Sequence, residues 1–188
     1  MSHDIQNDIA KILLSEDEID KIVKRISAEI DAHYKERDSR LLLLGILKGS
    51  VVFMGDLMKH ITVPVEIDFM KVSSYGAGTV STGSVNIILD LYRKDMPNTD
   101  ILIVEDIIDS GRTLSYLVEY LSLKGAKSVR TCTLLDKPER REVDFEADFV
   151  GAVIPNEFVV GYGLDYDEKY RALPFVGVLK PHVYSGEA

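Results

Sequence analysis

The sequence predicts an α/β fold, in which a mainly parallel, twisted β-sheet is flanked by helices. Two features predict this class: short, continuously apolar runs of strand length, and longer segments between them whose apolar residues recur at helical spacing. Hydrophobic residues make up 46% of the 188-residue chain, which is ample for one sizeable core. We therefore expect a single domain over residues 1–188.

The first expected element is a helix. Ser15 and Glu18 match a capping box, and isoleucine and valine residues then recur at helical spacing as far as Ile30. Strand-like and helix-like segments alternate after that point. The expected strands are residues 41–46, 65–69, 85–91, 100–104, 128–135, 149–154 and 175–179. The expected helices among them are residues 50–61 and 114–124, the second ending at Gly125.

One long loop interrupts this alternation. Residues 73–83 contain three glycines and no core residues, and loops of this length in compact proteins are usually functional. In parallel sheets, ligands bind beyond the carboxyl ends of the strands. The segments that directly follow strands are therefore the first candidates for a functional site.

Composition limits the partners of the protein. The net charge is −9 and no long basic stripe is present, which disfavours a nucleic-acid binder. An acidic protein that binds an anion must neutralise it locally, with a divalent metal, backbone amides and a few cationic side chains. The single cysteine, Cys132, is typical of a reducing compartment. No signal peptide and no apolar run near the ~20 residues of a membrane helix are evident, so we expect a soluble, cytoplasmic protein without a membrane partner.

Residues 104–113, Val-Glu-Asp-Ile-Ile-Asp-Ser-Gly-Arg-Thr, carry the strongest functional signal. Glu105 and Asp106 are adjacent carboxylates at the carboxyl end of an apolar strand, and such oxygen ligands suit Mg²⁺ or sugar hydroxyls. A small-residue turn and a helix N-terminus follow, which together offer backbone N–H donors to a phosphate. A simple helix cap by Asp109 or Ser110 would leave the acidic pair unexplained. The segment predicts a site for a magnesium-bound sugar phosphate.

This segment resembles the 5-phosphoribosyl-1-pyrophosphate motif of type I phosphoribosyltransferases, in which an apolar strand, two acids and two apolar residues precede D-S-G-x-T. Other segments resemble the hypoxanthine-guanine branch, and the resemblance covers nearly the whole chain. It implies a small hood formed by terminal segments beside the sheet. It also implies Mg²⁺ as cofactor and transfer of the phosphoribosyl group to hypoxanthine or guanine, giving IMP or GMP and pyrophosphate.

The resemblance assigns the sugar-phosphate site. Residues implied to bind the ribose and its 5′-phosphate are Glu105, Asp106, Asp109, Ser110, Gly111, Arg112 and Thr113. Asp109 is the candidate catalytic residue, because it would accept or share the proton on N7 of the purine. The implied metal ligands are Glu105, Asp106 and Asp165.

The resemblance assigns the remaining site residues to three other segments. Lys48 and Gly49 would form a pyrophosphate loop with Arg171; the order Lys48-Gly49 does not fit a Walker loop. The peptide bond before this lysine can be cis in the family. Ser74 and Tyr75 would begin a mobile loop that closes over the substrates. The implied purine-binding residues are Ile107, Lys137, Phe158, Val159 and Asp165.

The preference for a 6-oxopurine depends on Lys137, because an ammonium donates to an oxo group and repels an amino donor. Xanthine-preferring and pyrimidine-type transferases are alternatives within the enzyme class. A different class is a regulator of the same fold that senses the sugar phosphate and binds nucleic acid, although the acidic charge disfavours it. The resemblance also implies a homodimer or homotetramer.

Overall fold

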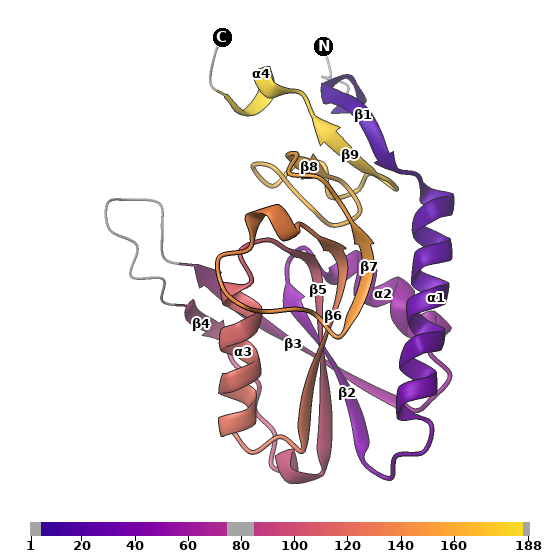
Figure 1. Ribbon diagram of the computed structural model, residues 1–188, viewed down its shortest axis with the longest axis vertical. Helices are drawn as coiled ribbons and strands as arrows, with labels where there is room; N and C mark the ends of the chain where they lie inside the picture. Colours follow the sequence, from indigo (N-terminus) through magenta and orange to yellow (C-terminus); the bar gives the residue numbers. More distant parts are fainter. Residues whose placement is uncertain (1–4, 75–84, 186–188) are drawn as a thin grey trace.

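The computed structural model describes residues 5–74 and 85–185, and its centre is a six-stranded sheet in the order β4-β3-β2-β5-β6-β7 (Figure 1). Its strands are β2 (Arg40–Leu47), β3 (Val65–Ser74), β4 (Val85–Leu89), β5 (Thr99–Ile108), β6 (Ser128–Asp136) and β7 (Phe149–Val153). All neighbouring pairs are parallel except the edge pair of β3 and β4. The predicted mainly parallel sheet is therefore confirmed.

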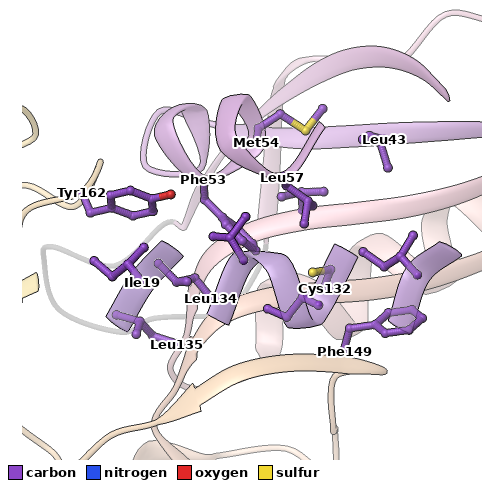
Figure 2. Packing of buried hydrophobic residues seen from close by; sticks show 14 of the residues in the cluster. Ile19, Leu43, Phe53, Met54, Leu57, Cys132, Leu134, Leu135, Phe149 and Tyr162 are labelled. Atoms are coloured by element: carbon purple, nitrogen blue, oxygen red, sulfur yellow. The ribbon is translucent and has the colours of Figure 1, made fainter. Parts of the chain in front are cut away.

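Helices cover both faces of this sheet. α1 (Glu16–Tyr34) and α2 (Val51–His60) lie on one face, and α3 (Arg112–Leu123) lies on the other. Successive residues of β2 point to opposite faces, so Leu43 packs with α1 and α2 while Leu42 packs with α3. Figure 2 shows the first of these clusters, in which Phe53 of α2 lies close to Ile19 of α1. Burial on both faces explains why the central strands are continuously apolar.

The first helix begins as the sequence predicts. The side chain of Ser15 accepts the backbone N–H of Glu18, and the Glu18 side chain accepts the backbone N–H of Ser15 at 2.8 Å, which completes a capping box. Ile19, Val23 and Ile26 are buried along one face of α1. The capping box therefore fixes where the chain passes from the terminal segment into the helix.

The hood is a second, three-stranded antiparallel sheet in the order β1-β9-β8. It contains β1 (Ile9–Leu14), β8 (Val159–Val160) and β9 (Val176–Leu179), and α4 (Pro181–Tyr184) follows it. Short 3₁₀ helices occupy Ile5–Asp8, Met96–Asn98 and Pro138–Arg140. Figure 1 shows the hood above the carboxyl ends of the central strands. Terminal segments thus form the hood, as the resemblance implied.

Several predicted boundaries were wrong. β5 does not end at Val104 but continues to Ile108, because its pairing with β6 extends to Ile108 and Asp136. α3 begins at Arg112, so Arg112 and Thr113 form its first turn. β3 includes Ser73 and Ser74 of the predicted loop, which pair with Asn86 and Val85 of β4; residues 75–83 lie outside the described residues.

β1 was not predicted from the sequence. No helix among residues 5–74 and 85–185 combines the length and the apolar character needed to cross a membrane.

Candidate active site

The acidic pair lies inside the last part of β5. Asp106 is 7% exposed, and its Oδ1 accepts the backbone N–H of Ile107 at 2.9 Å. Glu105 has an enclosed Oε2 atom that receives no hydrogen bond from the described residues. Burial, the adjacent Asp106 charge and a hydrogen bond between the two side chains raise the pKa of Glu105. Burial also raises the pKa of Asp106, although the Arg171 charge is among the opposing influences.

The raised pKa values indicate that too little positive charge surrounds these two enclosed carboxylates. A divalent cation, or a donor such as a sugar hydroxyl, would compensate both the desolvation and the mutual repulsion. The described residues contain no group of three or more metal-ligating side chains. Mg²⁺ commonly uses one or two carboxylates and takes its other ligands from substrate phosphates and water, so the pair fits this ion.

The turn after the acidic pair leads into α3. Gly111 precedes the helix with φ +81°, a left-handed conformation, and a Cβ there would lie 2.9 Å from Cδ of Arg141. Gly111 has no side chain to cap the helix, and the backbone N–H of Arg112 donates to the Ser110 hydroxyl at a long 3.4 Å, so this N-terminus can still receive an anion. A cavity of about 100 Å³ lies here. It is lined by Glu105, Ile107, Ile108, Asp109, Ser110, Gly111, Thr113 and Leu114.

A basic segment after β6 supports this turn from the side. Asp109 is exposed, and its Oδ1 accepts Nε of Arg140 at 3.2 Å, while its backbone oxygen accepts Nη1 of Arg141 at 2.6 Å. Nε of Arg112 donates to Glu142 at 2.6 Å. Sequence reasoning did not select Arg140, Arg141 or Glu142, and the only signal for them was the density of charged residues around them.

The Lys48-Gly49 loop lies directly over the acidic pair. The peptide bond between Leu47 and Lys48 is cis. A Cβ at Gly49 would lie 1.6 Å from Oδ2 of Asp106, so only glycine fits against the carboxylate. A Cβ at Gly163 would lie 2.1 Å from the backbone oxygen of Gly49. Two glycines therefore allow β5, the loop after β2 and the segment after β8 to meet.

Arg171 and Lys48 meet around one carboxylate, that of Glu168. Lys48 Nζ lies 2.9 Å from Oε1 of Glu168, and Nη2 of Arg171 lies 3.3 Å from Oε2 of Glu168 and 2.8 Å from Oδ1 of Asp165. The Nε atom of Arg171 is enclosed and donates to none of the described residues. The structure thus brings together Lys48, Gly49, Asp165 and Arg171. Sequence reasoning missed Glu168, which holds two of them.

The backbone of this segment is strained. Tyr162, Asp167, Glu168 and Tyr170 are non-glycine residues with φ between 50° and 74°. Such conformations persist where surrounding contacts impose them, and they often occur at functional sites. Here the Tyr162 hydroxyl donates to Asp56 at 2.7 Å, and the Tyr170 hydroxyl donates to Asp8 at 2.6 Å. These two bonds hold the segment that carries Asp165 and Arg171.

Lys137 and Phe158 lie at the hood side of the turn. Lys137 is 9% exposed, its backbone N–H donates to Ile108, and its Nζ donates to the backbone oxygen of Glu157 at 2.7 Å. Burial lowers the pKa of Lys137, and the Asp109 charge opposes that shift. Phe158 follows Glu157 and is 39% exposed, whereas Val159 is buried in β8. The predicted purine-binding residues Ile107, Lys137, Phe158 and Val159 therefore come from three segments, which are the end of β5, the turn after β6 and the start of β8. Asp165 lies instead with Arg171.

The roles of Ser74 and Tyr75 stay a prediction. Ser74 is the last residue of β3, and Tyr75 lies outside the described residues.

Comparison with known proteins agrees with this geometry. Residues 10–167 match the phosphoribosyl transferase domain family, so the chain is a phosphoribosyltransferase by class. Hypoxanthine-guanine phosphoribosyltransferase of Bacillus subtilis is 56% identical over 180 residues, which are 96% of this chain and 98% of that protein. With this similarity over both full lengths, the chain belongs to the hypoxanthine-guanine phosphoribosyltransferase family.

Solved structures and longer relatives complete the comparison. A hypoxanthine phosphoribosyltransferase from Staphylococcus aureus has a TM-score of 0.90 at 49% identity, covering 98% of each chain. The bifunctional protein TilS/HprT of Listeria innocua is 56% identical over 181 residues. The chain spans 28% of the length of that protein and of its Listeria monocytogenes counterparts.

We expect Glu105→Gln to raise the melting temperature of the ligand-free protein. Folding raises the pKa of this carboxyl, so its destabilising effect grows as pH rises from 4.5, its ordinary value, and is complete above the folded-state pKa. An amide removes the charge and can still donate to Asp106. The variant should therefore melt a few degrees higher at pH 8, where about 1 kcal/mol corresponds to about 2–4 °C.

The melting temperature should be measured by calorimetry from pH 5 to pH 8, with Glu119→Gln on the exposed side of α3 as control. The advantage of Glu105→Gln should shrink toward pH 5. An advantage that does not depend on pH, or a lower melting temperature, would contradict this reading of the acidic pair.

We expect Gly49→Ala to destabilise the protein, because its Cβ would overlap Asp106. Overpacking of this kind costs about 1–3 kcal/mol. Gly55→Ala in α2 is the matched control, since its Cβ would meet no heavy atom within 4 Å and alanine favours a helix. Thermal melting should place Gly49→Ala below the wild type and Gly55→Ala level with it or above; equal melting of the two variants would disprove the steric argument.

Proposed function

We propose that this protein transfers the 5-phosphoribosyl group of 5-phosphoribosyl-1-pyrophosphate to hypoxanthine or guanine, giving IMP or GMP and pyrophosphate. One observation carries the proposal: the acidic pair and the uncapped α3 N-terminus lie between a cationic cluster at Lys48 and Arg171 and an ammonium at Lys137. The three groups match a sugar phosphate, a leaving pyrophosphate and an oxopurine. The names of the full-length relatives support the same reaction.

The sugar phosphate would bind at the end of β5. Backbone N–H groups of residues 110–113 would receive the 5′-phosphate, with hydroxyl donors from Ser110 and Thr113 and the charge of Arg112 nearby. Glu105 and Asp106 would accept hydrogen bonds from the ribose hydroxyls, which relieves the enclosed Oε2 of Glu105. Anchoring at both ends of the ribose would fix the position of its reacting carbon.

The pyrophosphate would leave toward Lys48, Gly49 and Arg171. Glu105, Asp106 and Asp165 are the residues that would hold Mg²⁺, directly or through water and substrate oxygens. When bound, the ion would neutralise negative charge on the leaving group. Lys48 and Arg171 would exchange their contacts with Glu168 for contacts with pyrophosphate oxygens, and so stabilise the charge that develops as the C–O bond breaks.

The purine would bind beneath the hood. The Lys137 ammonium, oriented by the Glu157 carbonyl, would donate to the 6-oxo group. The ring of Phe158 would stack on the base, backbone groups of Val159 would bind its edge, and Ile107 would pack against it. An adenine would place its 6-amino donor against the Lys137 donor, so the site selects oxopurines.

Asp109 would handle the proton. As a ring nitrogen of the purine forms a bond to the ribose carbon, the base gains positive charge, and a carboxylate near N7 accepts or shares the N7 proton. In the ligand-free protein, Nε of Arg140 donates to Oδ1 of Asp109 in an exposed ion pair, which a bound substrate could replace. The reaction takes place between small molecules, and we propose a cytoplasmic homodimer or homotetramer for the assembled protein.

We expect Asp109→Asn to lower kcat about 10²–10⁴-fold, the usual contribution of general base catalysis. The KM for the sugar substrate should change by less than about fivefold, because the amide keeps the shape of the turn. Asp144→Asn, an exposed acid in the same neighbourhood, is the control and should retain activity. Steady-state kinetics decide the role; an unchanged turnover of Asp109→Asn would exclude it.

We expect a spectrophotometric assay to show turnover of hypoxanthine and guanine with the sugar substrate, and loss of turnover when Mg²⁺ is chelated. The kcat/KM for adenine should be at least about 10²-fold lower, because a buried donor would face another donor. Xanthine belongs in the same assay, since Lys137 does not discriminate against it. Robust activity on adenine would refute the role given to Lys137.

A further inference from the structure

We infer that Tyr184, in the C-terminal helix α4, is a positioning residue for the purine, because its ring supports the Phe158 ring from behind. The inference rests on the proposed function, in which Phe158 is the stacking partner of the base. Tyr184 belongs neither to the 104–113 motif nor to the loop at Lys48. The geometry thus adds a residue outside the motifs to base recognition.

Two tyrosines fix the Phe158 ring. The rings of Phe158 and Tyr184 have centroids 4.7 Å apart and planes 17° apart, which is a stacked arrangement. Tyr166 meets Phe158 edge-on, with centroids 5.6 Å apart and planes at 87°. Both are favourable aromatic geometries. Tyr184 sets the plane of the Phe158 ring, and Tyr166 adds a second contact with a perpendicular ring.

Phe158 keeps a large exposed area beside its two tyrosine neighbours. The residue is 39% exposed although Tyr184 covers one face of its ring and Tyr166 lies against it. This exposed area leaves room for a further ring, and we take the face opposite Tyr184 to be the free face on which the base would lie. Lys137 donates to the carbonyl of Glu157, the residue before Phe158, which places the oxopurine donor beside the same stretch of backbone. A purine on the free face would complete a three-ring stack of base, Phe158 and Tyr184.

Both ends of the chain hold α4 in place. The backbone N–H of Lys180 donates to Asp8 at 2.8 Å, and its Nζ donates to Asn7 at 2.6 Å. Figure 1 shows α4 beside the first residues of β1 at the edge of the hood. Val183 packs on the hood cluster that contains Val160 and Leu179. Tyr184 is therefore anchored by contacts that do not involve the sugar-phosphate site.

The expected effect follows from preorganisation. A Phe158 ring without its support would have to be ordered by the base itself, and that cost would reduce the affinity for the purine. Loss of one aromatic pair corresponds to a rise of about 3–10-fold in the KM for the purine. The KM for the sugar substrate should not change, because the ring contact of Tyr184 among the described residues is with Phe158.

The test is steady-state kinetics of the full-length chain with hypoxanthine and with the sugar substrate varied in turn. Tyr184→Ala should raise the KM for hypoxanthine about 3–10-fold, with kcat and the KM for the sugar substrate within about twofold of the wild type. Tyr184→Phe should restore wild-type values, because stacking requires the ring and not the hydroxyl. Tyr92→Ala is the control, since Tyr92 is 84% exposed and far from α4 in the chain.

Tyr184→Leu separates the loss of stacking from a folding defect, because leucine keeps the apolar packing but cannot stack. This variant should raise the KM for hypoxanthine as Tyr184→Ala does, without a lower melting temperature. An unchanged KM for hypoxanthine in these variants would overturn the inference. A lower KM would also overturn it, because Tyr184 would then occupy the face used by the base. An inactive wild type would instead refute the proposed function, so the two failures are distinguishable.

Discussion

The enclosure of Glu105 and Asp106 at the end of the central strand is the constraint on which the surrounding structure depends. Two adjacent carboxylates with raised pKa values are unfavourable in a ligand-free interior, and Oε2 of Glu105 has no compensating donor among the described residues. Their cover is made of backbone: Gly49 lies against Asp106, and Gly163 lies against Gly49. The strand, the loop and the hood segment can meet only because no side chain intervenes. The acidic pair therefore costs stability in the ligand-free protein, and under the proposed function a cation and a ribose would supply the missing charge and donors.

The cationic side chains near the acidic pair form weak, exposed ion pairs in the ligand-free protein. Lys48 pairs with Glu168, and their side chains are 51% and 65% exposed; Arg140 pairs with Asp109, at 53% and 48%. Exposed ion pairs of this kind contribute only about 0–1 kcal/mol, so an anionic substrate can replace them at little cost. This arrangement reconciles a net charge of −9 with an anionic substrate, because positive charge is needed only within a few ångströms of the phosphates. The strained segment from Tyr162 to Tyr170 provides one of these counter-charges, Glu168.

The sequence identifies site residues that lie close together in the chain, but not site residues that only folding brings together. Glu105 to Thr113 could be interpreted directly, because strand, acids, turn and helix follow one another within ten residues. Glu168 gave no signal, and Arg140 gave only the density of charged residues around it, since their partners are 120 and 31 residues away. β1 could not be predicted because two register irregularities in its pairing with β9 break the alternation that identifies a strand. The end of β5 was placed too early because charged residues usually end a strand, whereas here the pairing with β6 continues beyond them.

Under the proposed function, the central sheet would bind the sugar phosphate and the hood would bind the base. The end of the parallel sheet carries the residues that would hold charge, and these belong to the last residues of β5 and to short segments directly after β2 and β5. The hood carries Phe158 and its supporting tyrosines, and it exists only because the two chain ends pair with each other. Asp8 links the two halves: its side chain accepts the hydroxyl of Tyr170, which precedes Arg171, and its backbone oxygen accepts the N–H of Lys180, which precedes α4. One N-terminal residue therefore constrains both the segment that would bind pyrophosphate and the helix behind the base, so changes at the chain ends can alter substrate binding without touching the motif.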